Sequence, residues 1–173
     1  MSDVSFPTVT YANIAGGRGR AAALAQRLQM ERYDYLEHQL TDEFEDMEKL
    51  NDWLKSSNSA LAELRVNRPA DDKQENEYGT FVDAQGKTQS VHQWMIDNGI
   101  PIDKSGDTKG RQSDFDAAIS NLKARVDTMN SDSQMELIRL QSLMDKVNQC
   151  VELATNLVAK DGKSKENILG NIR

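Results

Sequence analysis

The feature that most constrains this chain is a long alternation of three- and four-residue spacings between apolar residues in its last third. Ten of the twelve positions in this series are apolar or cysteine, and only Ser133 and Glu136 interrupt it. Such spacing lines up side chains along one face of a long helix that packs against another helix. The series consists of Ile119, Leu122, Val126, Met129, Ser133, Glu136, Leu140, Leu143, Val147, Cys150, Ala154 and Leu157.

A second stretch with a seven-residue apolar repeat lies earlier in the chain. It runs without proline from about Arg18 to Arg65 and is interrupted at Glu43 and Ser57. Each arm has about 45 residues, or roughly 70 Å of helix, which predicts a long antiparallel helical hairpin. The residues predicted to pack the first arm into this hairpin are Tyr33, Leu36, Leu40, Met47, Leu50, Leu54, Leu61 and Leu64.

The sequence between the arms has a different residue pattern, with short turns and brief apolar runs. A hairpin turning at Gly86 and a short helix from a Ser90 capping pattern to Asn98-Gly99 predict a small mixed α/β insert. The fold class is therefore mainly α. The predicted order is a disordered leader (1–17), a first coiled-coil helix (18–66), the insert (67–112), and a C-terminal coiled-coil helix with its tail (113–173).

Charge and hydropathy exclude several classes of protein. The net charge is -7, and residues 31–52 hold nine acidic residues against two basic ones, so nucleic acid is a poor partner. No run of about 18 apolar residues predicts a membrane span. The N-terminus lacks the basic and apolar regions of a Sec signal peptide, which leaves export by another route open.

No pattern of reactive residues predicts an enzyme, a cofactor or a metal. Cys150 lies in the apolar series, where a buried cysteine acts as a small hydrophobe. His38 and His92 lack metal-ligand spacing, and we expect both to be exposed or partly packed. A calcium-loop pattern lacks its glycine and its terminal glutamate, so a solvated turn is the better interpretation. That pattern consists of Asp103, Ser105, Asp107 and Asp114.

The second arm carries one more apolar row than a two-helix hairpin needs. Leu137, Met144, Val151 and Val158 lie beside the packing series, and fully burying such side chains stabilises by roughly 1.5 to 3 kcal/mol each. We therefore expect self-assembly or a helical partner, unless the insert covers part of this row. The predicted assembly residues are Leu137, Leu140, Leu143, Met144, Val147, Cys150, Val151, Ala154, Leu157 and Val158.

Polar residues within the second arm add a resemblance to a known family. The arm resembles the C-terminal helix of the filament-forming tip proteins of bacterial type III secretion systems, the EspA and SseB family. The likeness covers about 45 residues, and the start of the first arm, "RGRAAALAQRLQ", and the segment "MIDNGIPI" are also similar to that family. The residues that carry it are Gln134-Met135, Ile138-Arg139-Leu140-Gln141, Asn148, Glu152, Thr155-Asn156 and the closing "ILGNIR".

This resemblance implies a secreted, non-enzymatic subunit at the bacterial needle tip. Such a subunit is exported without a cleaved signal, through an export signal in its leader (1–17). It assembles with itself through its C-terminal helix and supports the translocation pore. Its implied partners are the needle, the pore-forming translocator proteins and a cytoplasmic export chaperone. The alternative is a cytoplasmic coiled-coil adaptor or export chaperone that uses the insert as its recognition head.

Overall fold

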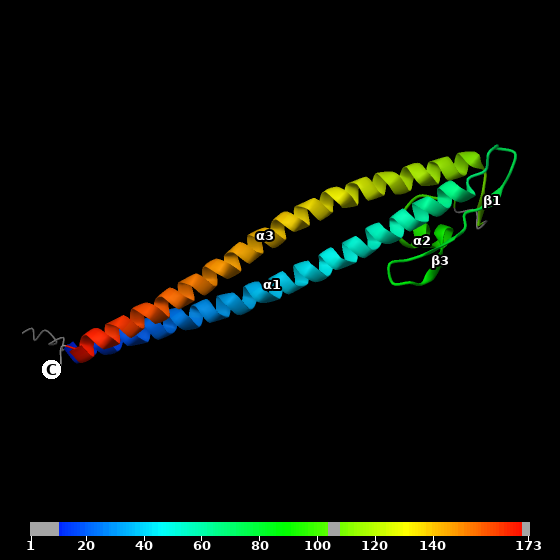
Figure 1. Cartoon of the computed structure of the whole chain (residues 1–173). Coiled ribbons are helices and arrows are strands. Elements are labelled where there is room, and N and C mark those ends of the chain that lie inside the picture. The colour runs from blue at the N-terminus through cyan, green and yellow to red at the C-terminus, as the bar shows by residue number, and fades with distance from the viewer. Residues whose placement is uncertain (1–10, 104–107, 171–173) are drawn as a thin grey trace, which may run out of the picture. The chain divides into compact units, whose positions relative to one another are not determined.

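Two long helices that pack together dominate the protein, as the computed structural model in Figure 1 shows. The structure describes residues 11–103 and 108–170. Helix α1 (Tyr11–Asn67) has 57 residues and helix α3 (Gln112–Gly170) has 59. The prediction of a mainly helical fold with a small mixed insert is confirmed. The insert contains β1 (Asn76–Glu77), β2 (Thr80–Val82), β3 (Thr88–Ser90), α2 (Val91–Asp97) and β4 (Lys109–Gly110).

The start of α1 differs from the predicted boundary. Residues 11–17 were predicted to belong to a disordered leader, but α1 begins at Tyr11 and includes Gly16 and Gly17. Each glycine costs about 1 kcal/mol in a helix, and the alanine-rich stretch that follows favours continued propagation. Residues 1–10 of the predicted leader lie outside the described residues.

The start of α3 is held by two aspartates. The helix begins at Gln112, one residue before the predicted boundary at residue 113. The Asp114 carboxylate accepts a hydrogen bond from the Arg111 N–H at 2.8 Å, and the Asp72 carboxylate accepts one from the Ser113 N–H at 2.9 Å. Because the first N–H groups of a helix have no partner within it, these carboxylates satisfy backbone donors at the start of α3.

Contacts divide the chain into two compact units. One unit consists of Met1–Asp42 with Gln141–Arg173, and the other of Glu43–Leu140. We call them the terminal unit and the insert unit, and each is described by itself.

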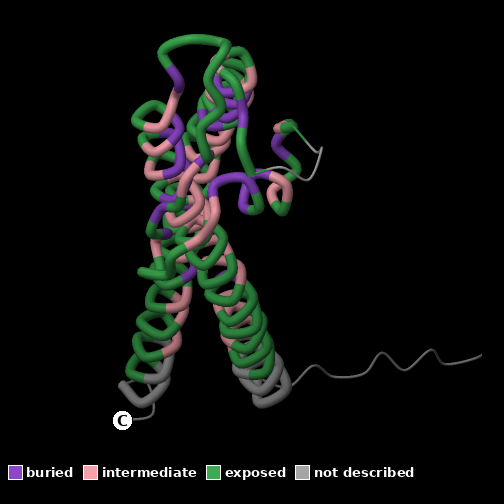
Figure 2. Tube along the Cα trace, turned by 90° about the vertical axis from the view of Figure 1, so that its right-hand side faces the viewer, coloured by how far each residue is buried: buried purple, intermediate pink, exposed green. Residues whose placement is uncertain are grey.

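The main hydrophobic core belongs to the insert unit, where the insert packs on α1 and α3 (Figure 2). Leu64, Phe115 and Leu122 are fully buried there, and the ring centroids of Tyr78 and Phe115 lie 4.7 Å apart. Among the described residues of the terminal unit, only Leu36 and Cys150 are buried apolar side chains. The remaining core residues are Ala60, Leu61, Tyr78, Phe81, Val91, Trp94, Met95, Ile100, Ala118 and Val126.

The predicted hairpin in the insert is confirmed. Strands β2 and β3 pair antiparallel, with Phe81 opposite Gln89. Asp83 organises the turn, because its Oδ1 accepts hydrogen bonds from the Gln85 and Lys87 N–H groups at 3.0 and 2.8 Å. The bond from Lys87 holds the pKa of Asp83 below its ordinary value. Gly86 has a φ of +81°, a conformation that glycine adopts without steric cost.

The predicted short helix is also confirmed, with one difference. Helix α2 follows Ser90 and is closed by Asn98 and by Gly99, which has a φ of +67°. The Ser90 side chain makes no capping hydrogen bond, so the capping pattern marked the start of the helix without forming the predicted cap. The pairing of β1 with β4 was not predicted, because two-residue strands carry no periodic signal.

Candidate assembly surface

The predicted packing face of α1 divides into buried and half-buried residues. Leu36, Leu61 and Leu64 are buried. The other residues predicted to pack the hairpin are half-buried, namely Tyr33, Leu40, Met47, Leu50 and Leu54. This packing face of α1 is therefore narrow, and its edges are accessible to water.

The packing series of α3 behaves in the same way. Leu140 is 8% exposed and Cys150 is 1% exposed, and the Cys150 thiol lies 3.2 Å from both the backbone oxygen and the side-chain oxygen of Gln29. Cys150 is therefore enclosed between two helices of the terminal unit. The other members of the series that were predicted to take part in assembly are half-buried, namely Leu143, Val147, Ala154 and Leu157.

The extra apolar row of α3 is uncovered in the single chain. Leu137 is 45% exposed, Met144 and Val151 are each 46% exposed, and Val158 is 58% exposed. We call these four residues the α3 row. The insert was the competing candidate to cover the row, and within the insert unit it leaves Leu137 open to water. The ten predicted assembly residues thus fall into two classes, those that pack within the chain and those that do not.

A groove adjoins the α3 row in the terminal unit. It has a volume of about 340 Å³ and lies between α1 and α3, with Val151 on one wall and Met30 on the other. Met30 is 67% exposed, and Leu24 and Leu28, which precede it on α1, are 59% and 56% exposed. The sequence interpretation did not include these α1 residues in the assembly surface. They do not form one stripe, because Met30 comes two residues after Leu28, about 200° around the helix.

Glu43 interrupts the apolar repeat of the first arm and Glu136 interrupts that of the second, and these two residues meet in the insert unit. Glu43 of α1 faces Glu136 of α3, and Arg139 pairs with Glu136 at 3.1 Å. Hydrogen bonding to the Glu136 carboxyl raises the pKa of Glu43 above its ordinary value, and desolvation and the negative charge of Glu136 raise it further. When both carboxyls are ionised, Glu43 Oε1 is buried without a hydrogen-bond donor among the described residues. Protonation lets one carboxyl donate to the other.

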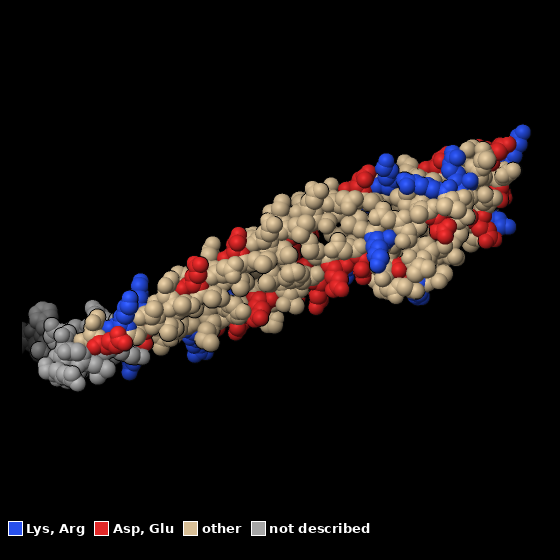
Figure 3. Space-filling view, viewed as in Figure 1, with Lys and Arg blue, Asp and Glu red and all other residues tan. Residues whose placement is uncertain are grey.

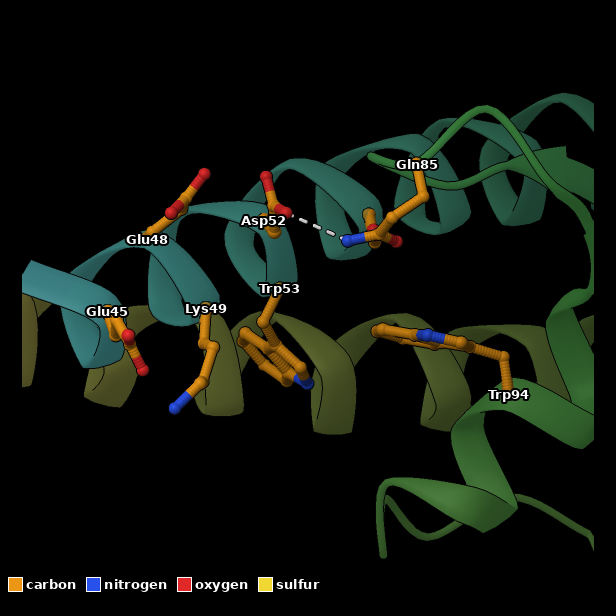
Figure 4. Close-up of a pocket in the computed structure, with 8 residues that line it drawn as sticks. Glu45, Glu48, Lys49, Asp52, Trp53, Gln85 and Trp94 are labelled. Carbon is orange, nitrogen blue, oxygen red and sulfur yellow. Dashed lines mark hydrogen bonds between the residues drawn. The ribbon is translucent and has the colours of Figure 1, made fainter. Parts of the chain in front are cut away.

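A second cavity of about 540 Å³ lies in the insert unit, and Figure 4 shows its walls. The indoles of Trp53 and Trp94 form one wall, with ring centroids 5.9 Å apart. The Asp52 carboxylate accepts a hydrogen bond from the Gln85 amide at 2.8 Å. We call this cavity the tryptophan pocket, and its lining residues are Glu45, Glu48, Lys49, Asp52, Trp53, Ser56, Gln85 and Trp94. Sequence reasoning did not find this pocket, because Trp53 and Trp94 come from different elements.

The two histidines differ in their burial. His38 is exposed. His92 is 6% exposed, stacks on Tyr78 and lies 2.6 Å from the Asp103 backbone oxygen, so the expectation of an exposed or partly packed residue was wrong for His92. The stacking and the hydrogen bond satisfy a buried imidazole.

Two of the four residues of the calcium-loop pattern, Ser105 and Asp107, lie outside the described residues. The Asp114 carboxylate is engaged at the start of α3. Among the described residues, no three His, Cys, Asp or Glu side chains gather closely enough to hold a metal ion. Within residues 11–103 and 108–170, no helix is long and apolar enough to span a bilayer.

No protein-family model, curated protein or solved structure matches the chain. Its function is therefore inferred from its own residues and geometry.

Proposed function

We propose that this chain is a secreted structural subunit of a type III secretion needle tip or extracellular filament, which assembles with copies of itself through α3 and supports the translocation pore. It has no enzymatic role in this proposal. The polar residues that the second arm shares with tip proteins, such as Arg139 and Asn148, support the class of protein. The α3 row supports the mode of assembly.

The α3 row is the observation that carries the proposal. Its four side chains recur every seven residues on one helix, and each is about half exposed. A fully buried side chain of this size contributes about 2 kcal/mol, so each of the four can still contribute about 1 kcal/mol to an interface. Regular spacing on one helix suits a second helix as the partner, and an identical chain presents the same row.

We further propose that the two arms form an antiparallel coiled-coil hairpin. Contacts within the insert unit support this direction. Arg68 near the end of α1 pairs with Asp116 near the start of α3 through two bonds of 2.6 and 2.7 Å. Glu43, earlier on α1, faces Glu136, which comes later on α3. The order of contacts along α3 is thus the reverse of that along α1.

An assembly assay tests the proposal. Replacing Met144 and Val151 with aspartate would place charges in the interface, and we expect the purified double variant to remain monomeric. The matched control is Ser142→Asp with Gln149→Asp, which adds the same charge at exposed polar positions two residues earlier, about 200° around the helix. We expect the control to assemble like the wild type. A wild-type chain that is strictly monomeric at high concentration by light scattering, with no rings or fibres in electron micrographs, would contradict self-assembly.

A secretion assay separates the tip subunit from the alternative adaptor or export chaperone. Deleting residues 2–10 leaves α1 intact and should abolish export of a tip subunit, whereas a cytoplasmic adaptor would be retained in the cell with or without these residues. In this proposal, a cytoplasmic export chaperone masks the α3 row before secretion. The needle and the pore-forming translocator proteins contact the assembled subunit.

A further inference from the structure

The charge of α1 is divided sharply along its length. Residues 11–30 contain three arginines and no acidic residue, whereas residues 31–52 contain nine acidic residues against two basic ones. Figure 3 shows carboxylates gathered along the α1 side of the face in view. The first stretch, which we call the basic segment, contains Arg18, Arg20 and Arg27.

The tryptophan pocket lies within the acidic part of this division. Glu45, Glu48 and Asp52 line it from one face of α1, while Lys49 is drawn to Asp46 by an ion pair of 2.9 Å. The pocket therefore combines three carboxylates with the half-buried indole of Trp53 and with Trp94, which is 7% exposed (Figure 4). A guanidinium group suits such a combination, because it pairs with carboxylates and stacks on aromatic faces.

The aromatic wall of the pocket is fixed in place before anything binds. The Trp53 Nε1–H donates a hydrogen bond to the Asn98 side-chain oxygen at 2.7 Å, and the Asn98 amide donates to the Trp94 backbone oxygen at 2.8 Å. Phe81 packs edge-on against Trp94, with ring centroids 5.4 Å apart. A ligand that stacks here would lose little free energy to ordering the wall.

We infer that the tryptophan pocket binds the basic segment of a second copy of this chain, with its arginines against the carboxylates and the indoles. The spacing of the charged residues supports this pairing, in addition to their charge. Arg20 and Arg27 are seven residues apart, as are Glu45 and Asp52, and seven helical residues span about 10.5 Å in both cases. Two helices lying side by side can therefore pair both positions at once.

The surroundings of the arginines also fit the pocket. Leu24 lies between Arg20 and Arg27 on the same face of α1 and is 59% exposed, so it can pack on an indole. Arg27 is paired with Glu31 at 3.2 Å in an exposed ion pair, which is weak enough to exchange partners. Both sequences belong to one continuous helix, which cannot fold back on itself, so a second copy must supply the basic segment.

This inference rests on the proposed self-assembly and adds a contact distinct from the α3 row. It is tested by adding a peptide of residues 16–30 to the full-length protein. The chain has only two tryptophans, both of which line the pocket, and the peptide has none. Tryptophan fluorescence therefore reports occupancy directly. We expect a saturable change in emission that weakens as salt is raised, because exposed charge pairs are screened.

Two matched controls define the result. A peptide with its three arginines replaced by glutamine should leave the emission unchanged. The protein variant Glu45→Gln with Glu48→Gln should bind the native peptide about tenfold more weakly, whereas Glu37→Gln with Asp42→Asn, which removes two exposed charges of α1 outside the pocket, should bind it normally. Equal binding of the glutamine peptide, or no response to the native peptide, would overturn the inference.

Charge reversal in the full-length chain tests the same contact during assembly. Arg20→Glu with Arg27→Glu should weaken assembly, as should Glu45→Arg with Asp52→Arg, and we expect the chain that combines all four changes to assemble again. If the reversed chains assemble like the wild type while Met144→Asp with Val151→Asp does not, this inference fails and the proposed function stands. If the wild type does not assemble, the proposed function fails, and the peptide measurement still decides whether the pocket binds the basic segment.

Discussion

Truncating Leu140 and truncating the exposed members of the α3 row should have opposite consequences. Leu140 is 8% exposed, so Leu140→Ala leaves a void between two helices and should cost about 2 to 3 kcal/mol, toward the lower end of the range for buried leucines. Met144, Val151 and Val158 are about half exposed. Their replacement by alanine should leave the stability of the single chain nearly unchanged, because alanine favours helix.

The same three side chains should instead contribute to association. Their uncovered halves represent up to about 3 kcal/mol at roughly 2 kcal/mol for each fully buried side chain, which corresponds to about a hundredfold in the association constant. We therefore expect the triple alanine variant to require about a hundredfold higher concentration to assemble. Leu140→Ala should lower the melting temperature by about 5 to 10 °C.

Circular dichroism melting at a concentration where the chain is monomeric measures the first effect, and sedimentation velocity over a range of concentrations measures the second. The reasoning is refuted if the triple variant melts as early as Leu140→Ala under monomeric conditions, because the α3 row would then be covered within the chain. It is also refuted if the triple variant assembles at the same concentration as the wild type.

Two further predictions concern the insert unit and the end of α3. Gly110→Ala should destabilise the protein by about 2 kcal/mol, because an added Cβ would overlap the Tyr78 hydroxyl. The Cβ added by Gly162→Ala meets no atom within 4 Å, so this variant should be more stable than the wild type by up to about 1 kcal/mol. Thermal melting compares the two variants. Glu43→Gln should stabilise by roughly 0.5 kcal/mol at neutral pH, a small value because the site is partly solvated. The pKa of Glu43 is raised by Glu136, so the wild-type contact is stable in acid and weakens as pH rises through this pKa. Urea unfolding should show the advantage of Glu43→Gln at pH 7 and its loss in acid.

The elements that could be predicted are those whose signal is local or periodic. The seven-residue repeats located α1 and α3, Gly86 located the hairpin, and Asn98-Gly99 located the end of α2. The early start of α1 could not be predicted from Gly16-Gly17. Single residues set only a helix propensity, and propagation from the following residues decides where the helix begins. The pairing of β1 with β4 depends on two short segments meeting, for which the sequence contains no pattern.

The same distinction applies to the candidate sites. The position of the α3 row follows from spacing alone, but whether the insert covers it does not. Glu43 and Glu136 were each visible as interruptions, yet only the structure shows that they face each other and raise a pKa. The tryptophan pocket requires Trp53 and Trp94, 41 residues apart in the sequence, to lie 5.9 Å apart, and such a distance is set by packing.

By itself, the sequence determined that the chain forms two long helices, and that the second helix has more apolar surface than one partner can cover. The reason is that the spacing of apolar residues along the chain fixes which face of a helix they occupy. It also determined the division of charge along α1. Only the tertiary structure decided which of these apolar residues stay exposed, where the two tryptophans meet, and that His92 is buried. These outcomes depend on which surfaces of distant segments cover one another, and burial is a property of the packed chain and not of any one stretch of it.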